Sequence, residues 1–168
     1  MEKLCYYSSP IGKILISTKG NALSGIWLEK QEFRPLKGTD HIFDRSGYQN
    51  TVISWLDGYF SGKAPGPYEL NFYFEGTDFQ KTVWNELLDI PYGTTVSYGE
   101  LAERSARLIG KSRMSAQAIG QAVSRNRISI IVPCHRVIGK DGSLTGYAGG
   151  TDIKRWLLTH EGSIRNGI

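Results

Sequence analysis

Hydrophobic residues near the start of the chain alternate at the spacing of β-strands. The apolar runs 4–7 and 13–18 flank the turn-forming residues 8–12, a combination that predicts a β-hairpin. A second turn leads into a third predicted strand, 22–28. Apolar side chains within 52–60 then recur three and four residues apart, which predicts a helix. The first half is therefore expected to form a small sheet with one helix.

The second half has mostly helical spacing. Phe79, Trp84 and Leu87 mark one face of a helix that is expected to stop before Pro91-Tyr92-Gly93. Ser97 then fits the cap of a second helix, expected to run through about residue 104.

Residues 115–126 predict another short helix, which Ser115 can cap and which is rich in small side chains. The two helices have the order of a helix-turn-helix, although their connection is longer than the usual three or four residues. The Ala and Gly residues would let the helix backbone approach a narrow DNA groove closely. The N-terminus of this helix carries no carboxylate, so its free backbone N–H groups are open to a phosphate. Tight packing in a protein core is the alternative explanation of the small residues.

The apolar run 128–132 predicts a buried strand, which ends at Pro133 because proline lacks the backbone donor that strand pairing needs. Cys134, His135 and Arg136 follow at once, and neighbouring cations stabilise a thiolate. The pattern indicates a nucleophile; a buried structural cysteine is the alternative. Side chains of consecutive extended residues point to opposite faces, so a water or a bend is needed between Cys134 and His135.

Composition narrows the class of protein. An apolar content of 40% is ample for the core of a 168-residue chain, and no apolar run approaches the length of a membrane span. The start of the chain does not resemble a signal peptide, so we expect a cytoplasmic protein without membrane contact. Two cysteines, Cys5 and Cys134, cannot form a disulfide framework. Three scattered histidines show no metal-ligand spacing, and we assign no metal.

The net charge of +4 is unevenly distributed. Positions 104–140 contain no acidic residue, which indicates contact with a polyanion, whereas a basic surface without a partner is the alternative. The basic residues of this stretch are Arg104, Arg107, Lys111, Arg113, Arg125, Arg127, Arg136 and Lys140.

Several motifs resemble, in the same order along the chain, those of the O6-alkylguanine-DNA alkyltransferases (methylated-DNA–protein-cysteine methyltransferases). Residues 133–137, Pro-Cys-His-Arg-Val, are similar to the active-site motif of this family. Residues 91–102 resemble its first helix-turn-helix segment, 146–150 its substrate loop and 156–162 its terminal helix. The first half of the chain is similar only in outline.

The resemblance implies a fold of two domains. An N-terminal structural α/β domain, with an antiparallel sheet and a helix, would cover residues 1–75. A mainly helical domain for DNA binding and alkyl transfer would cover 76–168, with the helix-turn-helix and a short strand at the active site.

The same resemblance implies direct repair of DNA by a monomer that acts once and needs no cofactor. Double-stranded DNA containing O6-alkylguanine would be bound through its minor groove, and the damaged nucleotide would be flipped into the protein. Cys134 would take the alkyl group from O6 of guanine, and also from O4 of thymine. His135 would act as a water-mediated base that Glu161 holds, and Asn126 would hold the active-site turn.

The remaining roles also come from the resemblance. Tyr98 would press on the target phosphate and help to rotate the nucleotide, and the substrate loop would line the base pocket. From the residues alone, Glu161 can equally be a solvated acid, Asn126 a helix C-cap and Arg136 a structural residue. The residues assigned to the substrate and DNA are Tyr98, Gln117, Ala118, Gly120, Arg125, Arg136, Val137, Tyr147, Ala148 and Gly149.

Gln117 departs from the family pattern, which usually has an arginine at this position. That arginine inserts into the base stack where the flipped nucleotide was. Glutamine lacks its charge and planar stacking surface, so we expect weaker stabilisation of the flipped state without loss of activity.

Two other functions stay open. A cysteine hydrolase would need a Cys–His contact and an oxyanion hole, and the consecutive Cys134 and His135 argue against it. A non-catalytic protein that binds alkylated DNA would have no need of Cys134.

Overall fold

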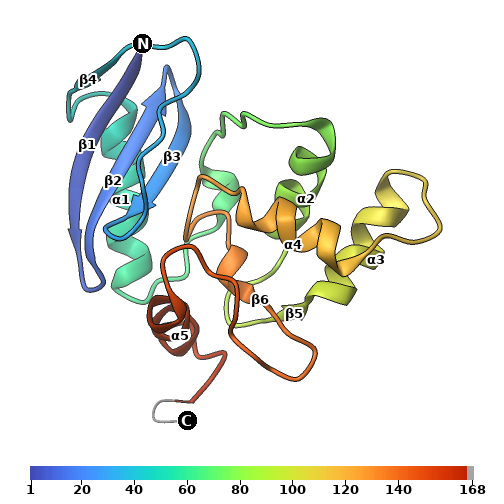
Figure 1. The fold of residues 1–168 in the computed structure, drawn as a ribbon. Coiled ribbons are helices and arrows are strands. Elements are labelled where there is room, and N and C mark those ends of the chain that lie inside the picture. Colours follow the sequence, from blue (N-terminus) through green and yellow to red (C-terminus); the bar gives the residue numbers. More distant parts are fainter. Residues whose placement is uncertain (166–168) are drawn as a thin grey trace. The chain divides into compact units, whose positions relative to one another are not determined.

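The computed structural model describes residues 1–165, which form two compact units (Figure 1). The first unit holds residues 1–75 together with 127–129, and the second holds 76–126 and the chain from 130 onward. The last three residues of the expected domain 76–168 lie outside the described part of the chain.

A four-stranded sheet in the order β3-β2-β1-β4 forms the first unit. β1 (Glu2–Ser9), β2 (Gly12–Lys19) and β3 (Ala22–Leu28) are antiparallel neighbours, as the alternating pattern predicts. β4 (His41–Phe43) pairs in parallel with the start of β1. The sequence does not reveal β4, because its three residues are all exposed and show no alternation of burial.

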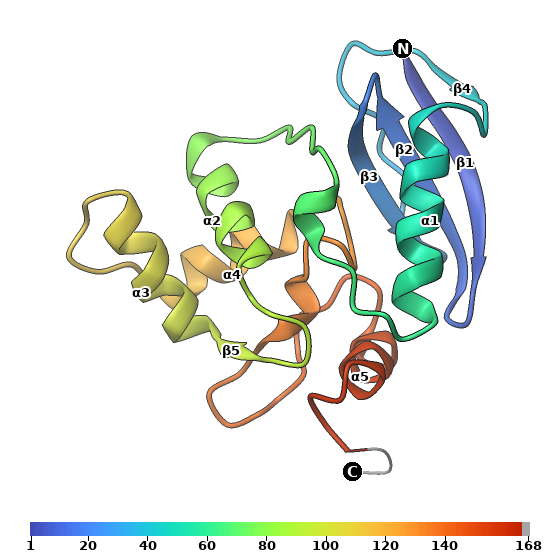
Figure 2. The same ribbon diagram turned by 180° about the vertical axis from the view of Figure 1, so that it is seen from behind.

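α1 (Tyr48–Phe60) lies along one face of this sheet (Figures 1 and 2). Its apolar stripe is buried, and polar contacts fix it to β1. The hydroxyl of Tyr7 donates to Asp57 at 2.7 Å, and the thiol of Cys5 donates to Gln49 at 3.0 Å. Cys5 is thus a buried strand residue. A short 3-10 helix (Pro67–Glu69) follows.

Three helices of the second unit pack against one another: α2 (Asp78–Leu88), α3 (Tyr98–Leu108) and α4 (Ala116–Ser124). The hydroxyls of Ser97 and Ser115 accept the backbone N–H of Glu100 and Ala118 at 3.1 Å, so both predicted caps are present. α3 runs one turn beyond the expected residue 104, because that turn buries Ser105 and Ala106. The order α3-α4 is that of a helix-turn-helix.

The rest of the second unit surrounds the cysteine. α5 (Thr151–His160) packs against a 3-10 turn (Cys134–Arg136), and the two-residue strands β5 (Val96–Ser97) and β6 (Val137–Ile138) form a parallel pair. Among the described residues 1–165, no helix has the length and apolar character needed to cross a membrane.

The prediction of a strand over 128–132 is wrong. Ile128 makes one isolated bridge with Ile26, and the chain then turns through Ile130, which has a φ of 71°. All five side chains of the run are buried. Their apolar character therefore reflects burial in a turn, and burial holds a β-branched residue in a backbone conformation that it rarely adopts. The short strand at the site, β6, follows the cysteine instead.

Candidate active site

Cys134 lies at the first position of a 3-10 turn, directly after the buried Pro133. Its N–H donates to the carbonyl of Val132 at 2.8 Å, and the N–H of Arg136 donates to that of Pro133 at 3.0 Å. The backbone bends here, so the extended geometry that would separate Cys134 and His135 does not apply.

Cys134 carries the thiol of this turn and as a residue is half-buried. Burial raises its pKa, whereas a hydrogen bond from Asn126, the ammonium group of Lys154 and the N–H groups of Cys134 and His135 lower it. Each opposing contact stabilises the thiolate, which is the reactive form of cysteine.

His135 and Glu161 form a fully buried pair in which Nε2 and Oε1 are 2.7 Å apart. Burial raises the pKa of Glu161, but His135 and Arg136 outweigh this effect and hold it at about 2. Burial lowers the pKa of His135 below its usual range, so its imidazole is neutral at pH 7. An ionised Glu161 can only accept, so Nε2 carries the proton. Nδ1, which is buried and bonds to no residue among 1–165, is left as a proton acceptor.

Arg136 is buried and completes this network. Its Nε and Nη2 donate to the two carboxylate oxygens of Glu161 at 2.8 and 3.0 Å, and its Nη1 donates to the carbonyl of Ile90 at 2.7 Å. The resemblance assigns Arg136 to DNA, whereas here its guanidinium is buried against Glu161. A contact with phosphate would require breaking a buried bidentate ion pair.

Asn126 connects the end of α4 to the active-site turn. Its amide donates to the carbonyl of Val132 at 3.0 Å and hydrogen-bonds the thiol of Cys134. The C-cap of α4 is Arg125, so Asn126 does not serve as the cap.

Lys154 is a buried residue of this site that sequence reasoning missed. Its Nζ donates to the carbonyls of Val137 at 2.6 Å and Thr145 at 3.3 Å. Burial lowers the pKa of Lys154, and the nearby Cys134 opposes that shift. The signal was present, because Lys154 shares the apolar face of α5 with Leu157 and Leu158 at helical spacing.

Tyr98, at the start of α3, reaches the carbonyl of Thr145, which Lys154 also contacts. Its hydroxyl donates to Thr145 at 3.4 Å, and Gly120 and Gly146 both lie against its side chain. Burial, and then the charge of Cys134, raise the pKa of Tyr98. The structure thus brings Tyr98 to the start of the segment 146–150, which the resemblance identifies as a substrate loop.

The other residues expected in the base pocket lie near these contacts in sequence. Val137 and Gly149 are buried, Tyr147 is half-buried and Ala148 is exposed. Among residues 1–165, no group of three or more His, Cys, Asp and Glu side chains could hold a metal ion.

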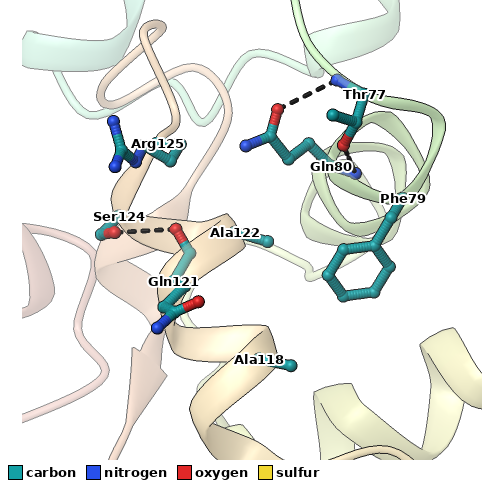
Figure 3. A pocket seen from close by; sticks show the side chains of 8 residues that line it. All are labelled: Thr77, Phe79, Gln80, Ala118, Gln121, Ala122, Ser124 and Arg125. Atoms are coloured by element: carbon teal, nitrogen blue, oxygen red, sulfur yellow. Dashed lines mark hydrogen bonds between the residues drawn. The ribbon is translucent and has the colours of Figure 1, made fainter.

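The outer face of α4 is polar. Gln117, Gln121 and Arg125 are exposed and follow one another at intervals of one turn, whereas Ala118 and Gly120 are half-buried. Next to this face, a cleft of about 460 Å³ lies between α4 and the start of α2 (Figure 3). Its lining residues are Thr77, Phe79, Gln80, Ala118, Gln121, Ala122, Ser124 and Arg125.

Comparison with known proteins agrees with this geometry. The family model of the 6-O-methylguanine DNA methyltransferase, DNA binding domain, matches residues 78–163. The methylated-DNA–protein-cysteine methyltransferase of Methanosarcina acetivorans is 42% identical over 157 residues, which is 94% of this chain and 96% of that protein. The Mycobacterium tuberculosis protein of the same name is 41% identical over 155 residues, covering 92% of this chain and 89% of that protein.

A solved structure gives the same result. The crystal structure of Mycobacterium tuberculosis OGT in complex with DNA has a TM-score of 0.81 and 40% identity, and covers 96% of this chain and 92% of that one. The fold and the site thus define a cysteine-dependent methyltransferase. The chain belongs to the methylated-DNA–protein-cysteine methyltransferase family. The relatives match over both halves, beyond the outline similarity that the first half suggests by itself.

Proposed function

We propose that this protein repairs alkylated duplex DNA by transferring an alkyl group from O6 of guanine, and from O4 of thymine, to Cys134. The arrangement that supports this most is a thiol adjacent in sequence to a neutral histidine whose Nε2 proton is held by an ionised carboxylate. His135 Nδ1 is then free to accept the thiol proton through a water, which is the logic of an activated nucleophile.

The transfer balances without a cofactor. The Cys134 thiolate attacks the alkyl carbon in line, an S–C bond forms, and the C–O6 bond breaks. Its electron pair stays on the base, which takes up a proton at N1 and becomes guanine. The product is a thioether, and it has no acyl carbonyl for water to attack. Each molecule therefore acts once.

DNA would be bound by the second unit through the minor groove, with α4 in the groove and Tyr98 against the target phosphate. Ala118 and Gly120 would permit the close approach, and Val137, Tyr147, Ala148 and Gly149 would line the base pocket. We assign a structural role to the first unit. The protein is expected to act as a monomer in the cytoplasm.

Mass spectrometry after mixing with excess duplex that carries one O6-methylguanine tests the proposal. We expect one added methyl group on the Cys134 peptide, saturating at one per protein and absent in Cys134→Ala. DNA binding without modification of Cys134 would instead support a non-catalytic lesion-binding protein.

Arg125 is expected to contact a DNA phosphate, since it is exposed beside the cleft at the end of α4. Arg125→Ala should weaken binding to alkylated and unmodified duplex alike. The slope of log affinity against log salt should become shallower by about 0.9, the value for one phosphate. Lys63→Ala, which removes an exposed cation of the first unit, is the control and should leave the slope unchanged. An unchanged slope in Arg125→Ala would remove this residue from the interface.

Gln117→Arg is expected to bind alkylated duplex about tenfold more tightly, because a guanidinium can stack in the space left by the flipped base. Binding is measured in a Cys134→Ser background, so that no transfer occurs. Gln121→Arg adds the same charge one turn along the same exposed face. It should raise affinity for alkylated and unmodified duplex equally. An equal gain for both duplexes in Gln117→Arg would contradict the prediction.

A further inference from the structure

The segment 90–93 and the active-site turn together enclose the guanidinium of Arg136. The carbonyl of Ile90 accepts from Nη1, and the ring of Tyr92 has the guanidinium carbon 5.7 Å from its centroid. Gly93 has a φ of 79°, and a Cβ built on it would lie 3.2 Å from the carbonyl of Glu161. The glycine therefore allows this turn to approach the end of α5 closely.

Arg136 uses its donors on two partners and has only 6% of its surface exposed. A surface cation that contacts DNA does not need a bidentate carboxylate, a backbone acceptor and an aromatic ring. Two of the hydrogen bonds from Arg136 instead go to Glu161, the residue that fixes the proton on His135. Both oxygens of that carboxylate are in use, because Oε1 accepts from Nη2 and from His135, and Oε2 accepts from Nε.

We propose that Arg136 is a positioning residue of alkyl transfer, which excludes a proton from the Glu161–His135 pair and so keeps His135 Nδ1 as the acceptor for the Cys134 proton. The inference rests on the proposed function. It gives a specific task to an arginine, two residues after the nucleophile, that the resemblance assigns to DNA.

The charges around the pair have the signs that this task requires. Arg136 lowers the pKa of Glu161 and also that of His135, and Lys154 on α5 lowers the pKa of His135 as well. Cys134 is the neighbouring acid, and Tyr92 is the titratable group that faces Glu161 from segment 90–93. Cationic neighbours thus oppose proton uptake by the pair.

Removing the guanidinium allows the Glu161–His135 pair to take up a proton. Alkyl transfer is blocked whether that proton sits on His135 or on Glu161. A proton on His135 makes an imidazolium, whose two nitrogens are both donors. A proton on Glu161 can be donated to Nε2, and the neutral ring then carries its hydrogen on Nδ1. In both cases the acceptor for the Cys134 proton is lost. The two sites titrate as one coupled pair, so the observable is the pH at which the pair loses that proton.

The test is the single-turnover rate of methyl transfer from O6-methylguanine duplex between pH 6 and pH 9, for wild type, Arg136→Met and Arg136→Lys. Arg136→Met should be at least about tenfold slower than wild type at pH 6 and recover to within about threefold at pH 9. Arg136→Lys keeps the charge without the parallel bonds, and its profile should lie between the two. Affinity for DNA, measured in a Cys134→Ser background, should be unchanged in both variants.

The outcomes are distinguishable. If wild type transfers no methyl group, the proposed function fails. If wild type reacts but Arg136→Met is slowed equally at every pH, Arg136 acts only on the fold and the inference is overturned. A loss of DNA affinity with an unshifted profile would return Arg136 to the DNA interface. If Arg136→Met does not fold, Arg136→Lys decides, since it must show a displacement at acid pH in the same direction but smaller, and an unshifted profile would overturn the inference.

Discussion

Glu161→Gln is expected to stop alkyl transfer almost completely and to lower the free energy of unfolding by about 3 to 5 kcal/mol, the usual cost of breaking a buried ion pair on one side. The carboxylate accepts one hydrogen bond from His135 and two from Arg136. Glutamine leaves the guanidinium buried without a counter-charge. The NH₂ group of glutamine also places a donor against the N–H groups of His135 and Arg136, which donate to the carboxylate in wild type.

The same substitution should change how stability depends on pH. The pKa of Glu161 is held at about 2 in the folded protein, below its value in an unfolded chain. Its contribution is therefore present above the unfolded pKa of about 4.3 and is lost as pH falls towards 2. Urea unfolding of wild type should show this loss, and Glu161→Gln should show less of it.

Glu103→Gln is the matched control, because Glu103 is an exposed carboxylate of α3. Its unfolding free energy should stay within about 0.5 kcal/mol of wild type. If Glu161→Gln is as stable as wild type at pH 7, the bidentate pair contributes little. The account of Arg136 would then lose its structural basis as well.

The fold could be predicted from the sequence only where burial is periodic. Helices and the three long strands follow from periodic burial, which a sequence records directly. The run 128–132 was misassigned because burial in a turn and burial in a strand both demand apolar side chains. The positive φ of Ile130 leaves no trace in residue type.

The site was predicted in part. The cysteine and the histidine are marked by the motif 133–137, the asparagine was supplied only by the resemblance, and the structure brings Cys134 and Asn126 together at the active-site turn. The burial of Arg136 could not be predicted, because its partner lies 25 residues further along the chain and no local pattern says whether a cation is buried. The resemblance supplied Glu161 as a partner of His135, whereas the residues alone describe it equally well as a solvated acid.

Lys154→Met is the second substitution with a large expected effect, both on stability and on the reactivity of Cys134. Methionine keeps an unbranched side chain, one heavy atom shorter, but leaves the carbonyls of Val137 and Thr145 without the ammonium donor. An unsatisfied buried acceptor costs about 1 to 3 kcal/mol, so the free energy of unfolding should fall by at least that amount. The chain at Thr145 would also lose its link to α5.

The chemical effect follows from charge. The ammonium of Lys154 lowers the pKa of Cys134 against the opposing effect of burial. Without it, the thiol pKa should rise further, and transfer at pH 7 should slow because a smaller fraction of Cys134 is thiolate. The rate of Cys134 alkylation by iodoacetamide, followed against pH by peptide mass spectrometry, reports that pKa without DNA.

Lys140→Met serves as the control, because Lys140 is an exposed cation of the same half of the chain. It should leave the alkylation profile unchanged. A shifted profile in Lys154→Met, together with slower methyl transfer, would establish that a buried cation supports the thiolate. Slower transfer with an unshifted profile would mean that Lys154 acts only by holding the carbonyls of Val137 and Thr145. The position of the chain around Thr145, rather than the thiol, would then limit the reaction.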